Sequence, residues 1–262
     1  MKKLFLLLGL LVLAFAFVGC DSDNDTAASG ERGTIIMGTS AGFPPFEFIA
    51  DHGQGRHGQY SGIDIAIGLR IAEALDKDLV IHDGDFHGLI PALQAETIDF
   101  IAAAMTIRPD RANNVHFSIG YFTAMQYIVV RADDTSINSA ADLDGKIIGV
   151  QTETTGNFFV EENVDYGTLL PFTLITPAFL DLMAGGLDAI VIDSVVAMQY
   201  ANRFSDELRI VADHDAFSSE HYGIAVRQDS EGIELLATIN AVLREMLDSG
   251  EMDDLFGYYA GS

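Results

Sequence analysis

From residue 34 onward, short β-prone runs alternate with segments in which the apolar residues recur at helical spacing. This alternation constrains the fold more than any other feature of the sequence. It continues to about residue 103 and starts again near residue 127. Strands that alternate with helices at this spacing predict an α/β fold, in which right-handed crossovers join parallel strands. Because the pattern occurs twice, we expect two α/β lobes, each with a sheet flanked by helices.

The chain passes between the lobes at two predicted crossing points, 121–125 and 218–222. The first lobe would contain 33–121 and 223–262, and the second would contain 122–222. Asp64 is a good N-cap for a helix through Leu75, and Pro91 fits a helix only in its first turn. The expected strands are 34–37, 79–81, 98–103, 127–131, 146–150, 189–192, 208–211 and 222–227, and the expected helical segments are 64–75, 86–94, 139–143, 154–162, 178–184, 195–204, 233–247 and 252–259.

Residues 1–19 have the pattern of an export signal: Lys2 and Lys3 precede an apolar run that is too short to span a membrane. The single cysteine, Cys20, follows directly. A cysteine at this place is typical of a lipobox, whose thiol receives a diacylglycerol and which carries acyl chains such as palmitate; Phe17 stands where Leu is usual. The alternative is an unmodified cysteine near an ordinary cleavage site. Residues 20–32 are polar and predict a flexible tether.

The formal net charge of the chain is −25, with 39 Asp and Glu against 14 Lys and Arg. Such a chain is repelled by the phosphate backbone, so nucleic acid is excluded as a partner. With one cysteine, no internal disulfide can form. We expect a monomer without a cofactor or a bound metal.

The stretch Ala102–Ser118 places a hydroxyl and a cation just past the end of a buried strand. Thr106 follows the small-residue run, and Arg111 comes five residues later. Open α/β sheets bind their ligands at the carboxyl ends of strands. The planar guanidinium of Arg111 matches a carboxylate, so this region predicts an anion site. The alternative is a surface arginine near a helix start.

Two features of the second lobe complement Arg111. Thr154-Thr155-Gly156 follows the strand 146–150 and begins a helix, so its backbone N–H groups would attract a negative group. Asp193 ends the apolar strand 189–192, where it can stay charged if it meets an ammonium. Each has a plainer interpretation as a helix N-cap. Phe43 and Phe86 could line a side-chain slot, or they could belong to the core.

Together these residues resemble the bacterial extracellular solute-binding proteins of family 3, the polar amino-acid binding components of ABC importers. The resemblance covers nearly the whole chain after the signal, and its segments occur in the family order. They are GTSAGFPPFEF (38–48), GIDIA (62–66), FHGLIPAL (86–93), MTIRPDR (105–111), VHFS (115–118), Tyr121, DLDGK (142–146), GVQ (149–151), TTG (154–156), LDAIVID (187–193) and YGIAV (222–226).

The resemblance implies a two-lobed periplasmic-binding-protein-like fold of type II, with mixed sheets and a two-strand hinge, and a role for each matching residue. Arg111 and the backbone of Thr155 would hold an α-carboxylate, and Thr106, the Ala104 carbonyl and Asp193 would receive an α-ammonium. The remaining residues implied are Phe43 and Phe86 beside the ligand side chain, Ser40 and Gln151 near its far end, and Met105 and Thr154 next to the residues already named.

Three positions depart from the family pattern. Glu153 replaces a usual Gly before the two threonines, and Ala104 stands where Gly is common. Ser40 lacks the carboxylate that some members use for cationic or amide side chains. The neutral far end of the slot favours a polar uncharged amino acid, and a cationic one remains open.

Other functions fit the sequence less well. Residues 38–42 match the G-x-S-x-G nucleophile elbow, which needs a helix directly after the serine; Pro44 and Pro45 follow instead. His52 and His57 lie in a glycine-rich loop without the firm spacing of a metal site. A cyclohexadienyl dehydratase on the same scaffold is the remaining alternative, with Glu153 as its candidate acid or base.

The sequence thus predicts an exported binding protein, not an enzyme, anchored by lipid to the outer face of a bacterial membrane or periplasmic. It would bind a free amino acid between its lobes and deliver it to an ABC permease, whose ATPase subunit drives import. The chain itself has no P-loop.

Overall fold

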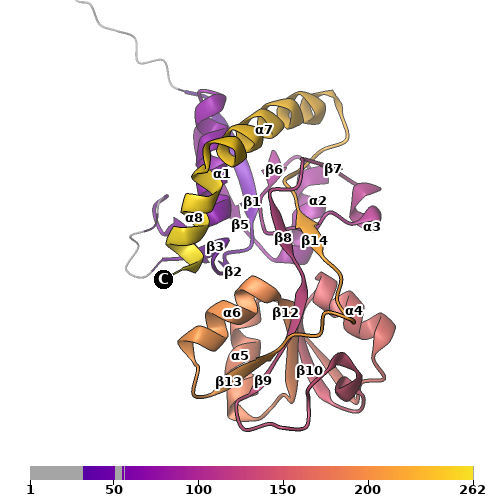
Figure 1. Ribbon diagram of the computed structural model, residues 1–262. Helices are drawn as coiled ribbons and strands as arrows, with labels where there is room; N and C mark the ends of the chain where they lie inside the picture. The colour runs from indigo at the N-terminus through magenta and orange to yellow at the C-terminus, as the bar shows by residue number, and fades with distance from the viewer. Residues whose placement is uncertain (1–31, 51–54, 56, 262) are drawn as a thin grey trace, which may run out of the picture. The chain divides into compact units, whose positions relative to one another are not determined.

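Two mixed sheets organise the computed structural model, which describes residues 32–50, 55 and 57–261 (Figure 1). The first sheet has the order β5-β1-β6-β15-β7, and we call the elements around it the first lobe. Strand β1 runs parallel to β5 and β6, whereas β15 is antiparallel to β6 and β7. The bounds are β1 Thr34–Thr39, β5 Asp78–Asp83, β6 Phe100–Ile101, β7 His116–Phe117 and β15 Ala225–Val226.

The second sheet, the centre of the second lobe, has the order β11-β10-β12-β9-β13. Strand β10 is parallel to β11 and β12, and β9 is antiparallel to β12 and β13. The apolar residues of β12 and β9 are buried, and helices α4, α5 and α6 pack on the sheet. The bounds are β9 Gln126–Arg131, β10 Ile147–Gln151, β11 Thr168–Phe172, β12 Ala189–Asp193 and β13 Leu208–Val211.

Strands β8 (Phe122–Ala124) and β14 (Glu220–Tyr222) pair antiparallel where the chain passes between the lobes (Figure 1). They lie within the two predicted crossing points. Their aromatic side chains form a cluster with Phe46 and Phe256: the ring centroids of Phe46 and Tyr222 are 5.0 Å apart, and those of Phe122 and Phe256 are 4.5 Å apart. The crossing strands are therefore held against the first lobe by ring packing.

The predicted helical segments agree with the structure to within a few residues, and the short helix α3 was not predicted. Pro91 lies in the first turn of α2, as expected. The helices are α1 Ile63–Ala74, α2 Leu89–Gln94, α3 Pro109–Ala112, α4 Thr155–Asn163, α5 Ile175–Ala184, α6 Ser194–Arg203, α7 Ser230–Ser249 and α8 Glu251–Ala260, with 3₁₀ turns η2 Phe86–Gly88 and η3 Ala140–Leu143.

Several expectations were wrong in detail. Asp64 does not cap α1: Gly62 occupies the N-cap, and the Asp64 carboxylate turns inward. The strand expected at 98–103 is shortened to Phe100–Ile101, and the one expected at 222–227 is divided between β14 and β15. The sequence pattern also missed β11, which contains Pro171, and a small sheet of β2 (Gly42–Phe43), β3 (Glu47–Ile49) and β4 (Tyr60–Ser61).

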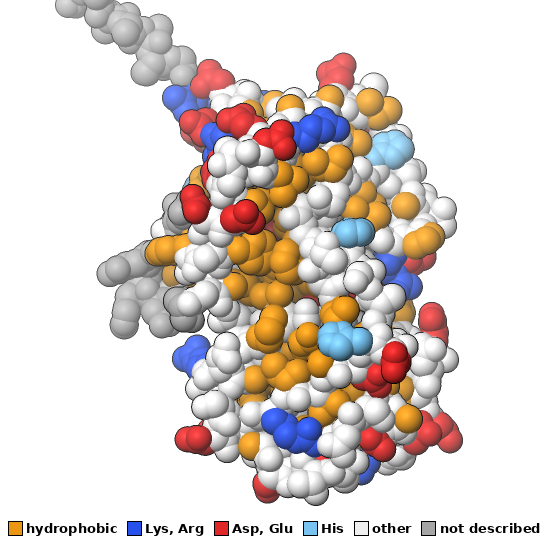
Figure 2. Space-filling model, viewed as in Figure 1, with side chains coloured by type: hydrophobic (Ala, Val, Ile, Leu, Met, Phe, Trp, Pro, Cys, Tyr) orange, Lys and Arg blue, Asp and Glu red, His pale blue; other side chains and the backbone are white. Residues whose placement is uncertain are grey.

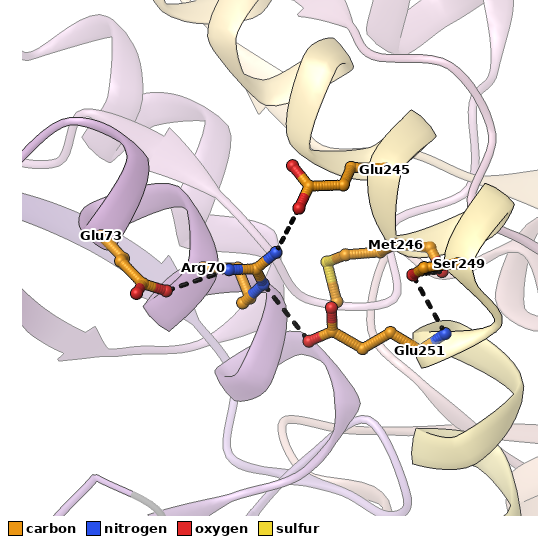
Figure 3. A network of polar contacts seen from close by, with 6 residues as sticks. All are labelled: Arg70, Glu73, Glu245, Met246, Ser249 and Glu251. Carbon is orange, nitrogen blue, oxygen red and sulfur yellow. Dashed lines mark hydrogen bonds and ion pairs between the residues drawn. The ribbon is translucent and has the colours of Figure 1, made fainter.

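The C-terminal helices pack on the first lobe, because α1 contacts both α7 and α8. Arg70 of α1 connects the three helices, with its guanidinium 3.0 Å from Glu73, 3.0 Å from Glu245 of α7 and 3.3 Å from Glu251 of α8 (Figure 3). One cation thus offsets part of the negative charge of three neighbouring carboxylates.

The predicted signal, Cys20 and most of the tether lie outside the described residues, as does His52. Within the described part of the chain, no helix is both long and apolar enough to cross a membrane, and no group of His, Cys, Asp and Glu could hold a metal ion. Hydrophobic side chains gather along the middle of the face in Figure 2, and Asp and Glu side chains lie mainly toward its edges. The acidic surplus is thus at least partly on the surface.

Candidate functional site

A small cavity lies between the two lobes. Most of its lining comes from residues at or just after the carboxyl ends of β1, β6, β10 and β12, where parallel α/β sheets collect ligands. Those sheet ends bring together segments up to 150 residues apart in the sequence. The lining residues are Ser40, Phe43, Glu47, Phe86, Ala103, Ala104, Thr106, Arg111, Gln151, Thr154, Thr155 and Asp193.

Arg111, on the short helix α3, is the cation of this cavity, and 6% of the residue is exposed. Its Nη1 donates to the Thr106 carbonyl (3.0 Å), and its Nη2 donates across the cleft to the Glu153 carbonyl (2.9 Å). Its guanidinium carbon lies 5.1 Å from the centre of the Phe86 ring. Because a guanidinium has five N–H donors, these bonds leave donors for a ligand carboxylate. Burial, with Arg108 nearby, lowers the pKa of Arg111 to about 10, so it stays charged at neutral pH.

The first turn of α4 faces the cavity from the second lobe. Thr154 is the N-cap, and its hydroxyl accepts a hydrogen bond from the Asn157 N–H. Gly156 is required here, because a Cβ at this position would lie 2.7 Å from the Val191 carbonyl oxygen. The close approach of α4 to β12 brings the positive end of the helix to the cavity, where it favours an anion.

Asp193 ends β12, and 5% of the residue is exposed. It occupies the N-cap position of α6 but makes no capping bond. Its Oδ1 accepts instead from Gln126 Nε2 (2.8 Å), which also donates to the Thr155 hydroxyl (2.9 Å). Burial, together with Glu220, raises the pKa of Asp193 to about 7. A buried carboxylate in this state gains stability when it meets a cation.

The remaining walls are apolar rings and buried polar groups. The rings of Phe43 and Phe86 line the cavity, as the sequence predicted. Gln151 is held by a bond from Nε2 to the Thr173 carbonyl (3.2 Å), while its Oε1 has no hydrogen-bond partner among the described residues. The buried hydroxyl of Ser40 likewise has no partner there. These oxygens can meet a polar group of a ligand.

Of the residues implied by the sequence, Met105 alone does not line the cavity. It is 1% exposed, packs in a core cluster with Leu89 and Val115, and borders a surface pocket beside Arg111. The sequence interpretation also missed Glu47 and Ala103. Glu47 is 1% exposed, and a carboxylate between Phe46 and Phe48 in an apolar segment was the signal that could have identified it. The slot therefore contains an ionisable group, the carboxyl of Glu47.

The fold and the cavity define a two-lobed binding protein of type II periplasmic architecture. The family model for bacterial extracellular solute-binding proteins, family 3, matches residues 35–262. The chain belongs to this family.

Its relatives are binding proteins. The arginine-binding extracellular protein ArtP of Bacillus subtilis is 32% identical over 97% of this chain and 96% of its own. The L-cystine-binding protein TcyJ of Escherichia coli K12 is 27% identical over 96% of this chain and 94% of its own. The structure of an ancestral arginine-binding protein bound to arginine is 38% identical, with a TM-score of 0.78 over 87% of this chain and 99% of that one. Another similar structure is of an ancestral arginine-binding protein bound to glutamine. These relatives support substrate binding and give no support to the dehydratase alternative.

Proposed function

We propose that this chain is the substrate-binding component of an amino-acid ABC importer and that its preferred ligand is a basic amino acid, such as arginine. The main support for this proposal is that Arg111 and Asp193, which belong to different lobes, line the same cavity. A free amino acid has one carboxylate and one ammonium, and this pair of opposite charges matches them. The full set of contacts with the ligand would form only when both lobes contact it.

The α-carboxylate would accept hydrogen bonds from Arg111 and from the first N–H groups of α4 at Thr155. The α-ammonium would donate to Asp193, to the Thr106 hydroxyl and to the carbonyl of Ala104. Ala104 has a positive φ of 46°, and its N–H is fixed by the Asp64 carboxylate (2.7 Å). This bond holds the backbone around the ammonium site in place.

The ligand side chain would extend between Phe43 and Phe86 toward Glu47, Ser40 and Gln151. A guanidinium or ammonium there would meet the buried carboxyl of Glu47, whose Oε2 has no hydrogen-bond partner among the described residues. The overall charge of −25 would also attract a cation. The arginine-binding relatives favour the same ligand class.

Thermal shift with the twenty common amino acids, ornithine and cystine, followed by calorimetry, tests the assignment. We expect arginine to bind and Arg111→Ala to weaken every ligand by at least 100-fold, because the variant removes the charge-assisted bonds to the shared carboxylate. Ser40→Ala should change only the order of preference among ligands. Arg244→Ala, an exposed arginine on α7, is the matched control and should bind as the wild type does. Tight binding by the Arg111 variant would contradict the proposal.

We also propose that the chain is an exported lipoprotein, anchored through Cys20 to the outer face of the cell membrane, and that its ligand-bound form docks on a permease with an ATPase subunit. The support is the signal pattern of 1–19 followed by Cys20. Cys20→Ser should release the protein from the membrane fraction into the soluble fraction, because acyl chains provide the anchor. Retention of the variant in the membrane would count against lipidation.

A further inference from the structure

Glu47 is an acid on the cavity wall that has a second acid behind it. Glu47 of β3 and Phe43 of β2 are directly opposite each other in the antiparallel pairing, and both line the cavity. The residue is 1% exposed and its Oε2 is buried without a hydrogen-bond partner in the described chain. Glu47 is therefore a buried carboxyl group with an oxygen available to a ligand.

Asp64 of α1 is a second, fully buried acid that acts on Glu47. Its two oxygens accept from the Tyr121 hydroxyl at 2.8 and 2.9 Å, and one of them accepts from the Ala104 N–H at 2.7 Å. Its charge also acts on Glu47 and raises the pKa of that carboxyl group. Two neighbouring carboxyl groups in a buried site resist ionising together, because like charges repel and burial disfavours each charge.

Of the two carboxyl groups, the surroundings favour protonation of Glu47 over that of Asp64. Asp64 has donors from Tyr121 and Ala104, which stabilise its ionised form and offset part of the burial that raises its pKa to about 6. Burial first, then Asp64, and also Asp83 and Asp193, raise the pKa of Glu47 well above its usual value. The groups that act on Glu47 from α1, β5 and β12 are thus acids, Tyr121 and Tyr222 are the neighbouring phenols, and Arg111 is the cation on the same cavity wall. Burial and the surrounding acids favour the neutral form of Glu47 in the ligand-free protein.

Resting on the proposed binding of a basic amino acid, we infer that the cationic side chain displaces the Glu47 proton, so that arginine releases one more proton on binding than a neutral amino acid of the same shape. The Glu47 O–H bond breaks, its proton goes to solvent, and the carboxylate left behind pairs with the ligand guanidinium. With a neutral ligand the proton stays, and the Glu47 hydroxyl donates to a carbonyl oxygen of the ligand side chain. One site can then hold both kinds of side chain.

Calorimetry in two buffers of different ionisation enthalpy counts the protons released. Citrulline is the matched ligand, because it replaces the guanidinium of arginine by a neutral urea and keeps the same zwitterion. Any proton lost from Asp193 on meeting the ammonium is common to both ligands and cancels in the difference. We expect arginine to release more protons than citrulline, by up to one, and an arginine-to-citrulline affinity ratio that rises with pH, by up to about tenfold per pH unit while Glu47 is protonated in the free protein.

Glu47→Gln keeps the shape of the side chain and removes its titration. In this variant the proton difference should vanish, and arginine should bind at least tenfold more weakly while citrulline changes less than threefold. Asp248→Asn, which removes an exposed acid on α7 away from the cavity, is the control and should keep the proton difference. If Glu47→Gln fails to fold, the pH dependence of the wild-type affinity ratio decides.

The outcomes separate the two proposals. Arginine binding with the same proton release as citrulline overturns this inference and leaves the proposed function standing. A difference that persists in Glu47→Gln also overturns it, because another group then titrates. Failure of every amino acid to bind overturns the proposed function itself.

Discussion

The second lobe meets the cavity with a helix end and the end of a strand, whereas the first lobe meets it mainly with long side chains. On the second lobe, the first turn of α4 offers backbone N–H groups, and Asp193 is fixed by Gln126. On the first lobe, Phe43, Glu47 and Phe86 come from separate segments and their side chains form the wall. The two walls also hold charge differently, because Glu47 of the first lobe has a second buried acid, Asp64, that raises its pKa.

This difference separates two tasks. Backbone groups and a fixed carboxylate suit the carboxylate and ammonium that every amino acid has, so the second lobe can secure any member of the class. Long side chains from β2, β3 and η2 suit the part that differs between ligands, so the first lobe would set the preference. The proposed roles have exceptions on both sides. Arg111, Thr106 and Ala104 belong to the first lobe and would bind the groups shared by all amino acids, and Gln151 belongs to the second lobe and would lie near the ligand side chain.

Asp193→Asn is expected to change ligand affinity most, and it tests the role of the second lobe. The variant keeps an oxygen for Gln126 but removes the charge that meets the ammonium, so every amino acid should bind about 100-fold more weakly. Calorimetry with arginine and citrulline measures this. A loss confined to one of the two ligands would contradict the division between the lobes.

The same variant should stabilise the ligand-free protein at high pH. Because burial raises the pKa of Asp193 from 3.8 to about 7, the folded state disfavours its charged form, and stability is lost as pH rises between those values. A shift of this size corresponds to roughly 4 kcal/mol as an upper bound. Urea unfolding at pH 5 and pH 8 measures it: the gain of Asp193→Asn over the wild type should be larger at pH 8. An equal gain in stability at pH 5 and pH 8 would show that the raised pKa of Asp193 is not the cause.

Much of the fold followed from the sequence because alternation of strands and helices is a local signal. The β13 strand, Leu208–Val211, was predicted to the residue, and α4 began at its threonine cap. Strand β11 was missed because Pro171 is unfavourable in a strand, yet the parallel partner β10 accommodates it at the edge of the sheet. Tertiary pairing decided that element.

For the site, the sequence located most cavity residues near strand ends and helix starts, such as Asp193 and Thr155, but not Ala103 after β6. It missed Glu47 because the role of that residue depends on Asp64 and Tyr121, 17 and 74 positions away, which local spacing cannot bring together. Asp64 was interpreted as a helix cap for the same reason: its partners Ala104 and Tyr121 are distant in sequence. Met105 was included by adjacency alone, and its side chain turns into the core.

The smallest expected effect concerns a contact between the lobes that touches no ligand. Arg108 of the first lobe lies over the ring of Phe158 on α4, with 4.5 Å from the guanidinium carbon to the ring centre. Because this contact forms only when the lobes meet, it should favour closure equally for every ligand, by about 0.5–1 kcal/mol for a partly exposed cation–π pair. Phe158→Leu removes the ring and keeps every charge, so arginine and citrulline should both bind roughly 2–5-fold more weakly by calorimetry. A change in their ratio would show instead that α4 takes part in reading the ligand side chain, and the division between the lobes would have to be redrawn.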